Sequence, residues 1–192
     1  MSVVSIMGKG NMGKAIASVV SRGNNEVDQL DRTSTEVKGD IVILAVPYPA
    51  LGPILAQLGD KLAGKIVVDI TNPLDFDTFD SLVVPAGSSA AAELASKLPA
   101  SKVLKAFNTT FAATLASGKV GEAGNTTTVL IAGDDSEAKA ALAKVVEAAG
   151  LKALDAGSLK RAHELEAIGF EQLVLASQER IPWTGGFAVV TK

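Results

Sequence analysis

Residues 2–17 read SVVSIMGKGNMGKAIA, and this stretch decides the fold. Its first part is apolar and β-branched, which is typical of a strand, and residues 8–13 (GKGNMG) then fit the pattern G-x-G-x-x-G. After the glycines, Ile16 and Val19 recur at helical spacing. A helix is therefore expected from the second half of the motif to Gly23, which is suited to a left-handed cap.

Each glycine of this turn has its own chemical purpose. Gly8 allows a sharp turn, Gly10 lets a pyrophosphate approach the backbone, and Gly13 lets the helix pack close to the strand. The free N–H groups and the positive dipole end of the helix then face the phosphates. We therefore predict a dinucleotide site. Its turn residues are Gly8, Lys9, Gly10, Asn11, Met12 and Gly13.

A second motif overlaps the first. Residues 8–14 also fit G-x-x-x-x-G-K, the beginning of a nucleoside-triphosphate loop, and Asp69 could pass for its metal-binding acid. Such a loop needs a Ser or Thr hydroxyl at the next position to bind Mg²⁺, and Ala15 has none. The dinucleotide interpretation is therefore favoured over nucleotide hydrolysis.

The composition excludes several other classes of protein. The 192 residues are 47% hydrophobic, which suits one buried core and a single domain, residues 1–192. A net charge of −3 without a basic cluster gives no sign of a nucleic-acid or membrane partner. No cysteine is present, and the aliphatic run 41–46 is far shorter than the ~20 residues of a membrane span. We expect a cytoplasmic protein.

The second predicted strand, residues 26–31, bears on the choice of cofactor. Asp31 follows Gly10 by 21 residues, where a dinucleotide-binding domain places the residue that meets the adenosine ribose. Asp31 alone favours the free 2′-hydroxyl of NAD, whereas Arg32, Thr33 and Ser34 suit the 2′-phosphate of NADP. A polar turn that simply faces water is the plain alternative. On balance we predict NADP (NADPH).

The next strand follows early. Residues 32–40 span only ~14 Å as a helix but up to ~30 Å when extended, and a return along a six-residue strand needs ~20 Å. The connection is therefore expected to be extended, with one strand-helix unit of the usual fold missing. Strand 41–46 then lies on the far side of the first strand, and the crevice between them is the topological switch point.

Alternating elements continue to the end of the chain and predict an α/β fold with a doubly wound, mostly parallel sheet, the NAD(P)-binding Rossmann fold. Asp134 and Glu137 fit a capping box before an alanine-rich helix that ends at Gly150. The other predicted elements are a helix over 47–62, strand 65–70, helix 89–98, strand 103–107, a short helix from 111, strand 127–132, strand 152–155 and helix 158–180.

Ligands of an open parallel sheet bind outside the carboxyl ends of its strands. Small apolar residues follow the third strand, and Pro73 holds Asn72 extended, so that its amide could meet the nicotinamide ribose or carboxamide. Asn108 and Thr109 bring polar groups to the other side, although such residues also simply terminate strands. The predicted site residues at these ends are Ala45, Val46, Pro47, Thr71, Asn72, Pro73, Asn108, Thr109 and Thr110.

Five segments together resemble one known family. GKGNMG, AVPYPAL, VVDITNPL, KAFNTT and GSLKRAHELEAIGF are similar to segments of the NADP oxidoreductases dependent on the deazaflavin coenzyme F420, a family related to the cytosolic domains of six-transmembrane ferric reductases. The likeness spans about residues 3–187. It implies NADPH binding by the glycine turn and the polar turn, and hydride transfer to or from a flat ring stacked on the nicotinamide. The implied cofactor residues are Gly8, Lys9, Gly10, Asn11, Met12, Gly13, Arg32, Thr33, Pro47 and Asn72.

No residue is predicted to act as a proton-transfer catalyst. His163, the one histidine, precedes Ala167 and Phe170 on a helical stripe, which favours a packing role. A conjugated ring needs little acid-base help, because its own nitrogens exchange protons with water. We therefore assign only orientation, to Asn72, Asn108 and Thr109. A deazaflavin or flavin is the expected small-molecule co-substrate.

The C-terminal segment is expected to serve assembly. Residues 158–192 form an apolar helix and a tail, and we predict that they build a homodimer, although the tail could instead close over the nicotinamide pocket. Asp75, Asp77 and Asp80 lack the glycine and glutamate of a calcium loop, so we expect no metal site. Two alternatives remain open: a flavin, quinone or ferric reductase, and a non-catalytic NADP(H)-sensing module.

Overall fold

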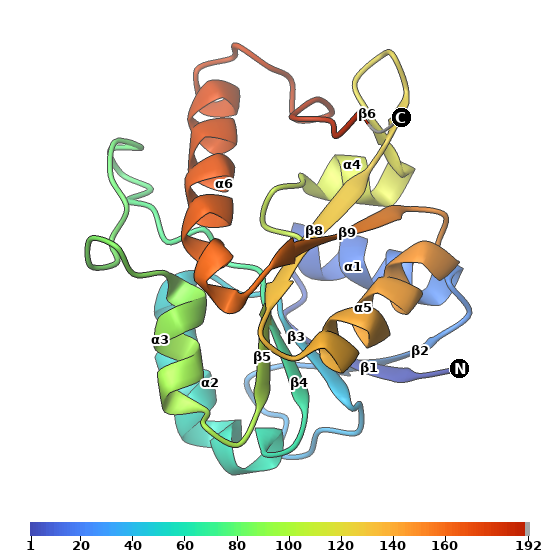
Figure 1. Ribbon diagram of the computed structural model, residues 1–192, viewed down its shortest axis with the longest axis vertical. Coiled ribbons are helices and arrows are strands. Elements are labelled where there is room, and N and C mark those ends of the chain that lie inside the picture. Colours follow the sequence, from blue (N-terminus) through green and yellow to red (C-terminus); the bar gives the residue numbers. More distant parts are fainter. Residues whose placement is uncertain (191–192) are drawn as a thin grey trace.

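A seven-stranded sheet lies at the centre of the protein, with helices on both of its faces (Figure 1). The computed structural model describes residues 1–190. The sheet strands are β1 (Val3–Met7), β2 (Glu26–Leu30), β3 (Ile41–Leu44), β4 (Ile66–Asp69), β5 (Lys102–Lys105), β8 (Thr128–Gly133) and β9 (Lys152–Gly157). Their spatial order is β2-β1-β3-β4-β5-β8-β9. The predicted Rossmann-like α/β fold is confirmed.

The helices alternate with these strands as the sequence predicts. They are α1 (Asn11–Arg22), α2 (Leu51–Leu58), α3 (Ala90–Lys97), α4 (Ala112–Ser117), α5 (Ser136–Ala148) and α6 (Ala162–Ser177). Short 3₁₀ turns at Tyr48–Ala50, Gly59–Leu62 and Leu159–Arg161 flank α2 and α6. A small hairpin of β6 (Lys119–Val120) and β7 (Asn125–Thr126) was not predicted.

The topological switch point lies where the sequence places it. Strand β1 pairs in parallel with β2 on one side and with β3 on the other, with Met7 opposite both Leu30 and Leu44. The connection between β2 and β3 contains no helix or strand, so one strand-helix unit is missing, as predicted. The crevice at the carboxyl ends of β1 and β3 is therefore the place for a ligand.

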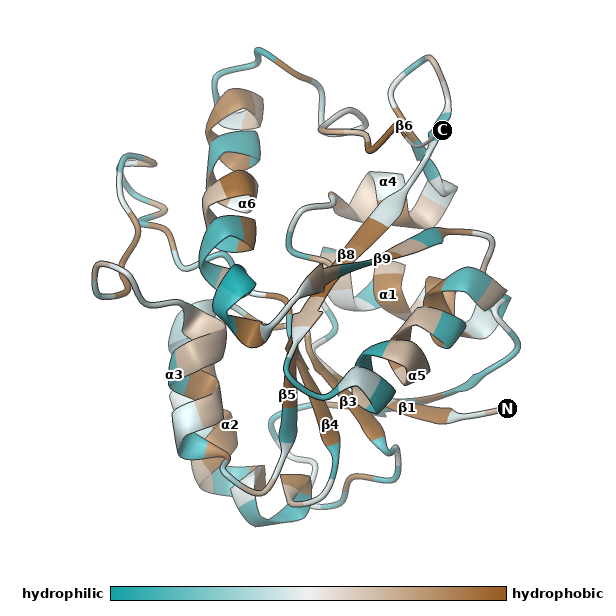
Figure 2. Cartoon of the chain, in the orientation of Figure 1, coloured by the Kyte–Doolittle hydropathy of each residue, from teal (hydrophilic) through white to brown (hydrophobic). Residues whose placement is uncertain are grey.

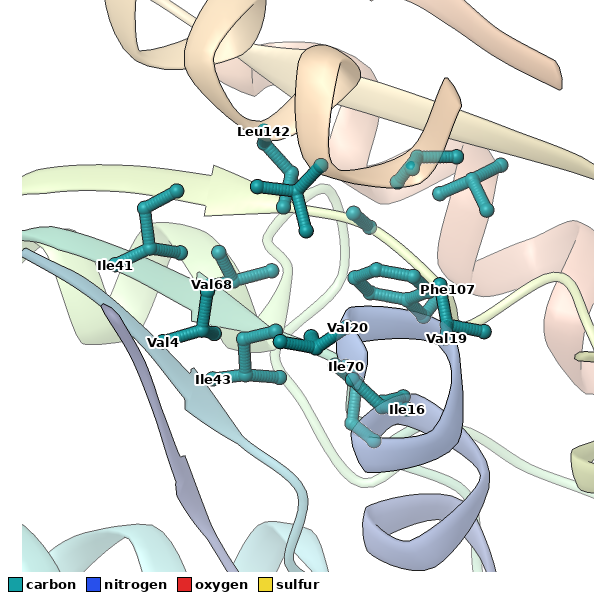
Figure 3. Packing of buried hydrophobic residues seen from close by; sticks show 14 of the residues in the cluster. Val4, Ile16, Val19, Val20, Ile41, Ile43, Val68, Ile70, Phe107 and Leu142 are labelled. Carbon is teal, nitrogen blue, oxygen red and sulfur yellow. The ribbon is translucent and has the colours of Figure 1, made fainter. Parts of the chain in front are cut away.

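Two hydrophobic clusters hold the layers together. On one face, Ile16 and Val19 of α1 pack with Ile43, Val68 and residues of α5, as Figure 3 shows. On the other face, α2 and α3 pack on the alternate side chains of the same strands. The central strands β3 and β4 are thus buried on both sides, which explains their continuous apolar runs (brown in Figure 2). Burial of each such side chain contributes about 1.5–3 kcal/mol.

Two details of the predicted helix ends are wrong. The carboxylate of Asp135, not Asp134, accepts the backbone N–H of Ala138 and caps α5, while Asp134 accepts the N–H of Leu159. Gly23 has a φ of −79°, and the left-handed residue after α1 is Asn24, with a φ of 57°. Across residues 1–190, every helix is too short or too polar to cross a lipid bilayer.

Candidate functional site

The three glycines of the turn differ in the space around them: two are tightly packed and one is open. A Cβ atom at Gly8, where φ is +115°, would overlap the carbonyl oxygen of Ala45, and a Cβ atom at Gly13 would overlap the carbonyl oxygen of Gly8. These two glycines therefore allow close packing of the turn, β3 and α1. A Cβ atom at Gly10 would have no heavy atom within 4 Å. The space next to Gly10 is thus free for a ligand that approaches the backbone.

The amino end of α1 is arranged to bind an anion. Gly10 is the N-cap, no side chain caps the helix, and its first turn contains no acidic residue. The N–H groups of this turn therefore keep their hydrogen-bonding capacity, and the helix dipole adds positive potential. A helix end of this kind is suited to bind phosphate oxygens.

A cavity of about 1000 Å³ opens beside this turn. It lies at the carboxyl ends of β1, β3, β4 and β5, the edge at which the sequence predicts the site. The predicted residues that line it are Gly10, Asn11, Met12, Ala45, Val46, Pro47, Thr71, Asn72, Asn108 and Thr110. Other predicted residues lie outside the lining, namely Gly8, Lys9, Gly13, Asp31, Arg32, Thr33, Ser34, Pro73 and Thr109.

Two asparagines from neighbouring strand ends bind each other at the cavity wall. The side-chain amide of Asn72 donates to the carbonyl of Asn108 (2.9 Å), and that of Asn108 donates to Asn72 Oδ1 (2.9 Å) and to the carbonyl of Leu165 (2.8 Å). Asn108 Oδ1 and Thr71 Oγ1 are buried and lack a hydrogen-bond partner among the described residues. The wall therefore retains unused polar capacity next to the cavity, and a carboxamide is a group that could use it.

The backbone turns abruptly just before Asn108. Strand β5 ends at Lys105, two residues earlier than predicted, and buried Phe107 has a left-handed φ of 64°. The N–H and the hydroxyl of Thr110 both donate to the carbonyl of Phe107, at 3.2 and 2.7 Å. This conformation is costly for a non-glycine residue, and such strain is common where a fold positions a functional side chain.

The polar turn after β2 is joined to the glycine turn by an ion pair. Lys9 Nζ lies 2.6 Å from Asp31 Oδ2, and Thr33 donates its N–H and hydroxyl to the other carboxylate oxygen. The Lys9 ammonium and the Thr33 donors hold the pKa of Asp31 far below its usual range. Arg32 is exposed and has no ion pair or hydrogen bond within residues 1–190. The free positive charge of this turn therefore belongs to Arg32.

A buried ionic cluster beneath the site was missed by the sequence analysis. Lys105 Nζ lies 2.8 Å from the carboxylate of Asp69 and 2.7 Å from that of Glu166, and it donates to the carbonyl of Thr71 at 2.5 Å. All three charged side chains are at most 1% exposed. Burial raises the pKa of Glu166, and the nearby Lys105 opposes this rise. Asp69 and Lys105 lie opposite each other in the paired strands β4 and β5. A single acid in one apolar strand and a single base in the next could therefore have predicted this ion pair from the sequence.

Gly169 of α6 packs directly on the asparagine pair. A Cβ atom there would overlap Asn72 Oδ1 and lie 2.8 Å from the carbonyl oxygen of Asn108. The sequence analysis did not select this residue, although a glycine inside a helical pattern often marks a close contact.

Aromatic side chains form the outer wall of the cavity. The rings of Phe111 and Trp183 have centroids 4.9 Å apart, and Phe76 and Tyr48 also line the space. The Tyr48 hydroxyl donates to the Glu93 carboxylate (2.6 Å), which raises the pKa of Tyr48 to about 12. His163 does not line the cavity.

The chain after α6 runs back over the molecule towards β6 (Figure 1). The N–H of Gly121 donates to the carbonyl of Thr184 (3.0 Å), and the N–H of Phe187 donates to the side chain of Gln172 (3.0 Å). These bonds hold Trp183 at the cavity.

The chain is similar to known reductases. A family model described as NADP oxidoreductase, coenzyme F420-dependent, matches residues 26–73. Rat metalloreductase STEAP3 is 34% identical over 182 residues, which are 86% of this chain and 36% of the relative. The F420-dependent NADP reductase of Methanocaldococcus jannaschii is 32% identical over 145 residues, 72% of this chain and 63% of the relative. The aligned regions thus span less than two thirds of the length of these two curated relatives.

A solved structure shares the whole fold. It is a proposed F420-dependent NADP reductase from Arthrobacter sp. FB24, which superposes with a TM-score of 0.85 over 100% of both chains at 22% identity. At this identity the superposition shows a common architecture.

Proposed function

Because this chain belongs to the NADP oxidoreductase family described as coenzyme F420-dependent, we propose that it transfers hydride between NADPH and a ring-type redox partner, a deazaflavin or a flavin-like molecule. The observation that carries the proposal is the open position at Gly10, where the uncapped end of α1 meets the cavity. Gly8 and Gly13 pack against neighbouring backbone, whereas no contact within the fold requires glycine at position 10.

In this proposal the turn residues 8–13 bind the two linked phosphates, and Arg32, Thr33 and Ser34 bind the 2′-phosphate. The ion pair with Lys9 offsets part of the negative charge of Asp31 beside that phosphate, which supports NADP over NAD. Asn72, Asn108 and Thr71 hold the nicotinamide end. Bound NADPH supplies the hydride.

The chain's own contribution to the reaction is orientation and exclusion of water. The Asn72–Asn108 pair fixes one wall of the cavity, while Phe111 and Trp183 offer flat apolar surface to a second ring. A ring acceptor takes its proton from water, so the absence of His163 from the cavity lining is compatible with catalysis.

Substitution of Gly10 by alanine tests the proposal. The φ of −72° at Gly10 suits alanine and the Cβ atom meets nothing, so the melting temperature should not change. The methyl group would displace phosphate from charge-assisted hydrogen bonds worth about 1.5–3 kcal/mol, which raises the Kd for NADPH roughly tenfold or more. Gly52→Ala in α2, which also meets nothing within 4 Å, is the matched control and should bind normally.

The outcomes separate the alternatives. If Gly10→Ala binds NADPH as tightly as the wild type, the phosphates do not rest on this turn and the proposal fails. Turnover of the wild type is measured separately, with NADPH and a panel containing a flavin, a deazaflavin, a quinone and a ferric chelate, to identify the acceptor. Tight NADPH binding without oxidation by any acceptor favours the sensing module.

We also propose that the protein is a cytoplasmic homodimer built through α6 and the tail. Ile168 on α6 is 37% exposed, Phe187 is 48% exposed, and Figure 2 shows hydrophobic residues on successive turns of α6. Such a surface suits a second copy of the chain. Analytical ultracentrifugation should show a dimer that Ile168→Asp converts to monomer, and a monomeric wild type would reject this part.

A further inference from the structure

The buried ion cluster contains two acids and only one base. An ammonium group has three N–H donors, and those of Lys105 have three acceptors. The acceptors are the carboxylates of Asp69 (2.8 Å) and Glu166 (2.7 Å) and the carbonyl of Thr71 (2.5 Å). With both carboxylates ionised, the cluster has a net charge of −1 in the interior of the protein.

The hydrogen bonds of the two carboxylates favour the ionised form. Asp69 Oδ1 accepts the N–H of Thr71 (2.9 Å), and Glu166 accepts the N–H groups of Ala90 (3.0 Å) and Ala91 (3.4 Å) at the start of α3. Within residues 1–190, every hydrogen-bond partner of these carboxylates is therefore a donor, whereas a protonated carboxyl group needs an acceptor for its own hydrogen. Burial raises the pKa of Glu166, and the neighbouring ammonium and N–H groups oppose that rise.

The cluster lies directly behind the cavity wall. Thr71 lines the cavity, and the cluster binds both its N–H and its carbonyl group. Asn108 also lines the cavity, and its side-chain amide donates to the carbonyl of Leu165, the residue before Glu166. Two neighbouring parts of the wall are thus attached to the cluster or to the residue beside it.

The negative charge of the cluster acts on the cavity lining. Tyr48 lines the cavity, and its pKa is raised to about 12. The hydrogen bond to Glu93 is the main cause, and the charges of Glu166 and Asp69 add to it. Charges buried in this way are screened by salt much less than charges at the surface.

Resting on the proposed function, which puts the nicotinamide beside Thr71, Asn72 and Asn108, we infer that the buried cluster stabilises the positively charged, oxidised nicotinamide. When hydride leaves C4 of dihydronicotinamide, the C–H bond breaks with both of its electrons, so a neutral ring becomes a cation. The acceptor ring gains that hydride and takes one proton from water. A net negative charge behind the wall attracts the cation and has no such effect on the neutral ring. The cluster therefore favours binding of NADP⁺ relative to NADPH.

Removal of one carboxylate charge tests this inference. Glu166→Gln keeps the size of the side chain and makes the cluster neutral. For a unit charge at roughly 10–15 Å and an effective dielectric constant of about 20, Coulomb's law gives about a 6- to 16-fold change in affinity. The Kd for NADP⁺ should accordingly rise about fivefold or more, while the Kd for NADPH stays within about twofold of the wild-type value. Isothermal titration calorimetry measures both constants on the whole chain without an acceptor.

A second variant and a control separate charge from structure. Asp69→Asn removes the other carboxylate charge, from β4, and should raise the ratio of the two Kd values in the same direction, so the test does not depend on the folding of one variant. Glu147→Gln removes an exposed carboxylate from α5, outside the cavity lining, and should change neither constant. Damage to the fold weakens the binding of both nucleotides, and it shows separately as a lower melting temperature.

Each result has a separate meaning. An unchanged ratio of the two Kd values in Glu166→Gln or Asp69→Asn, including an equal loss for NADP⁺ and NADPH, overturns the inference and leaves the proposed function intact. An equal rise of the ratio in Glu147→Gln also overturns it. If the wild type binds neither nucleotide, the proposed function itself fails, and the inference with it.

Discussion

The contact between Gly169 and the asparagine pair predicts what a single methyl group should do. In Gly169→Ala the new Cβ atom would overlap Asn72 Oδ1 and crowd the carbonyl of Asn108. The two hydrogen bonds between Asn72 and Asn108 then lengthen or break, at about 0.5–1.5 kcal/mol each. Overpacking adds about 1–3 kcal/mol, while the better helix propensity of alanine returns about 1 kcal/mol.

The net loss in the free energy of unfolding is therefore about 1–5 kcal/mol, which lowers the melting temperature by roughly 2–20 °C in a chain of this size. Because both asparagines line the cavity, kcat with NADPH should fall more than the Kd for NADPH rises. Differential scanning calorimetry and steady-state kinetics measure both effects. Gly52→Ala, on exposed α2 surface, should be neutral or slightly stabilising. If the two variants are equally stable, α6 does not pack on the pair as described.

Three further changes address other parts of the molecule. Arg32→Ala should raise the Kd for NADPH roughly tenfold and leave that for NADH unchanged in fluorescence titrations, and an equal loss for both would place the 2′-phosphate elsewhere. Lys105→Met leaves two buried carboxylates unpaired and should cost about 3–5 kcal/mol in urea denaturation, whereas a loss below about 1 kcal/mol would refute the ionic cluster. Asp135 has a lowered pKa because it accepts the Ala138 N–H and pairs with Lys102, so its stabilisation is present above its ordinary pKa of 3.8 and is lost as the pH falls through the lowered value. The melting temperature of Asp135→Ala should accordingly lie below that of the wild type at pH 7, with a difference that shrinks below pH 3.8; a constant difference would argue against the carboxylate as the cause.

Local signals in the sequence predicted most of the fold. The strand, glycine turn and helix at the start of the chain are fixed by residues that are neighbours in sequence, and the length of connection 32–40 alone placed β3 beside β1. The direction of β8 was not predicted separately, because hydropathy is the same for parallel and antiparallel strands, and β8 runs antiparallel to β5. The cap of α5 was placed one residue early because Asp134 and Asp135 are equally good caps by type.

In the candidate site, too, the residues set by local sequence were predicted and those set by long-range packing were not. Asn72 and Asn108 were expected at one edge of the sheet, since they follow parallel strands, and both line the cavity. Lys105 and Glu166 were not selected, because their contact depends on where α6 crosses the sheet, which no nearby residue specifies. Trp183 reaches the cavity because of the path of the tail after α6. Two hydrogen bonds of the tail, at Thr184 and Phe187, hold that path, and neither partner is near in sequence.

The cluster of Asp69, Lys105 and Glu166 restricts how this sequence can diverge. Loss of Lys105 leaves two carboxylates without a cation in a dry interior, whereas exchange of all three for apolar residues of similar volume is close to neutral. A single substitution at position 105 is therefore closed while both acids remain. Descendants of one ancestor with this fold that lack a cation at this position should also lack both carboxylates.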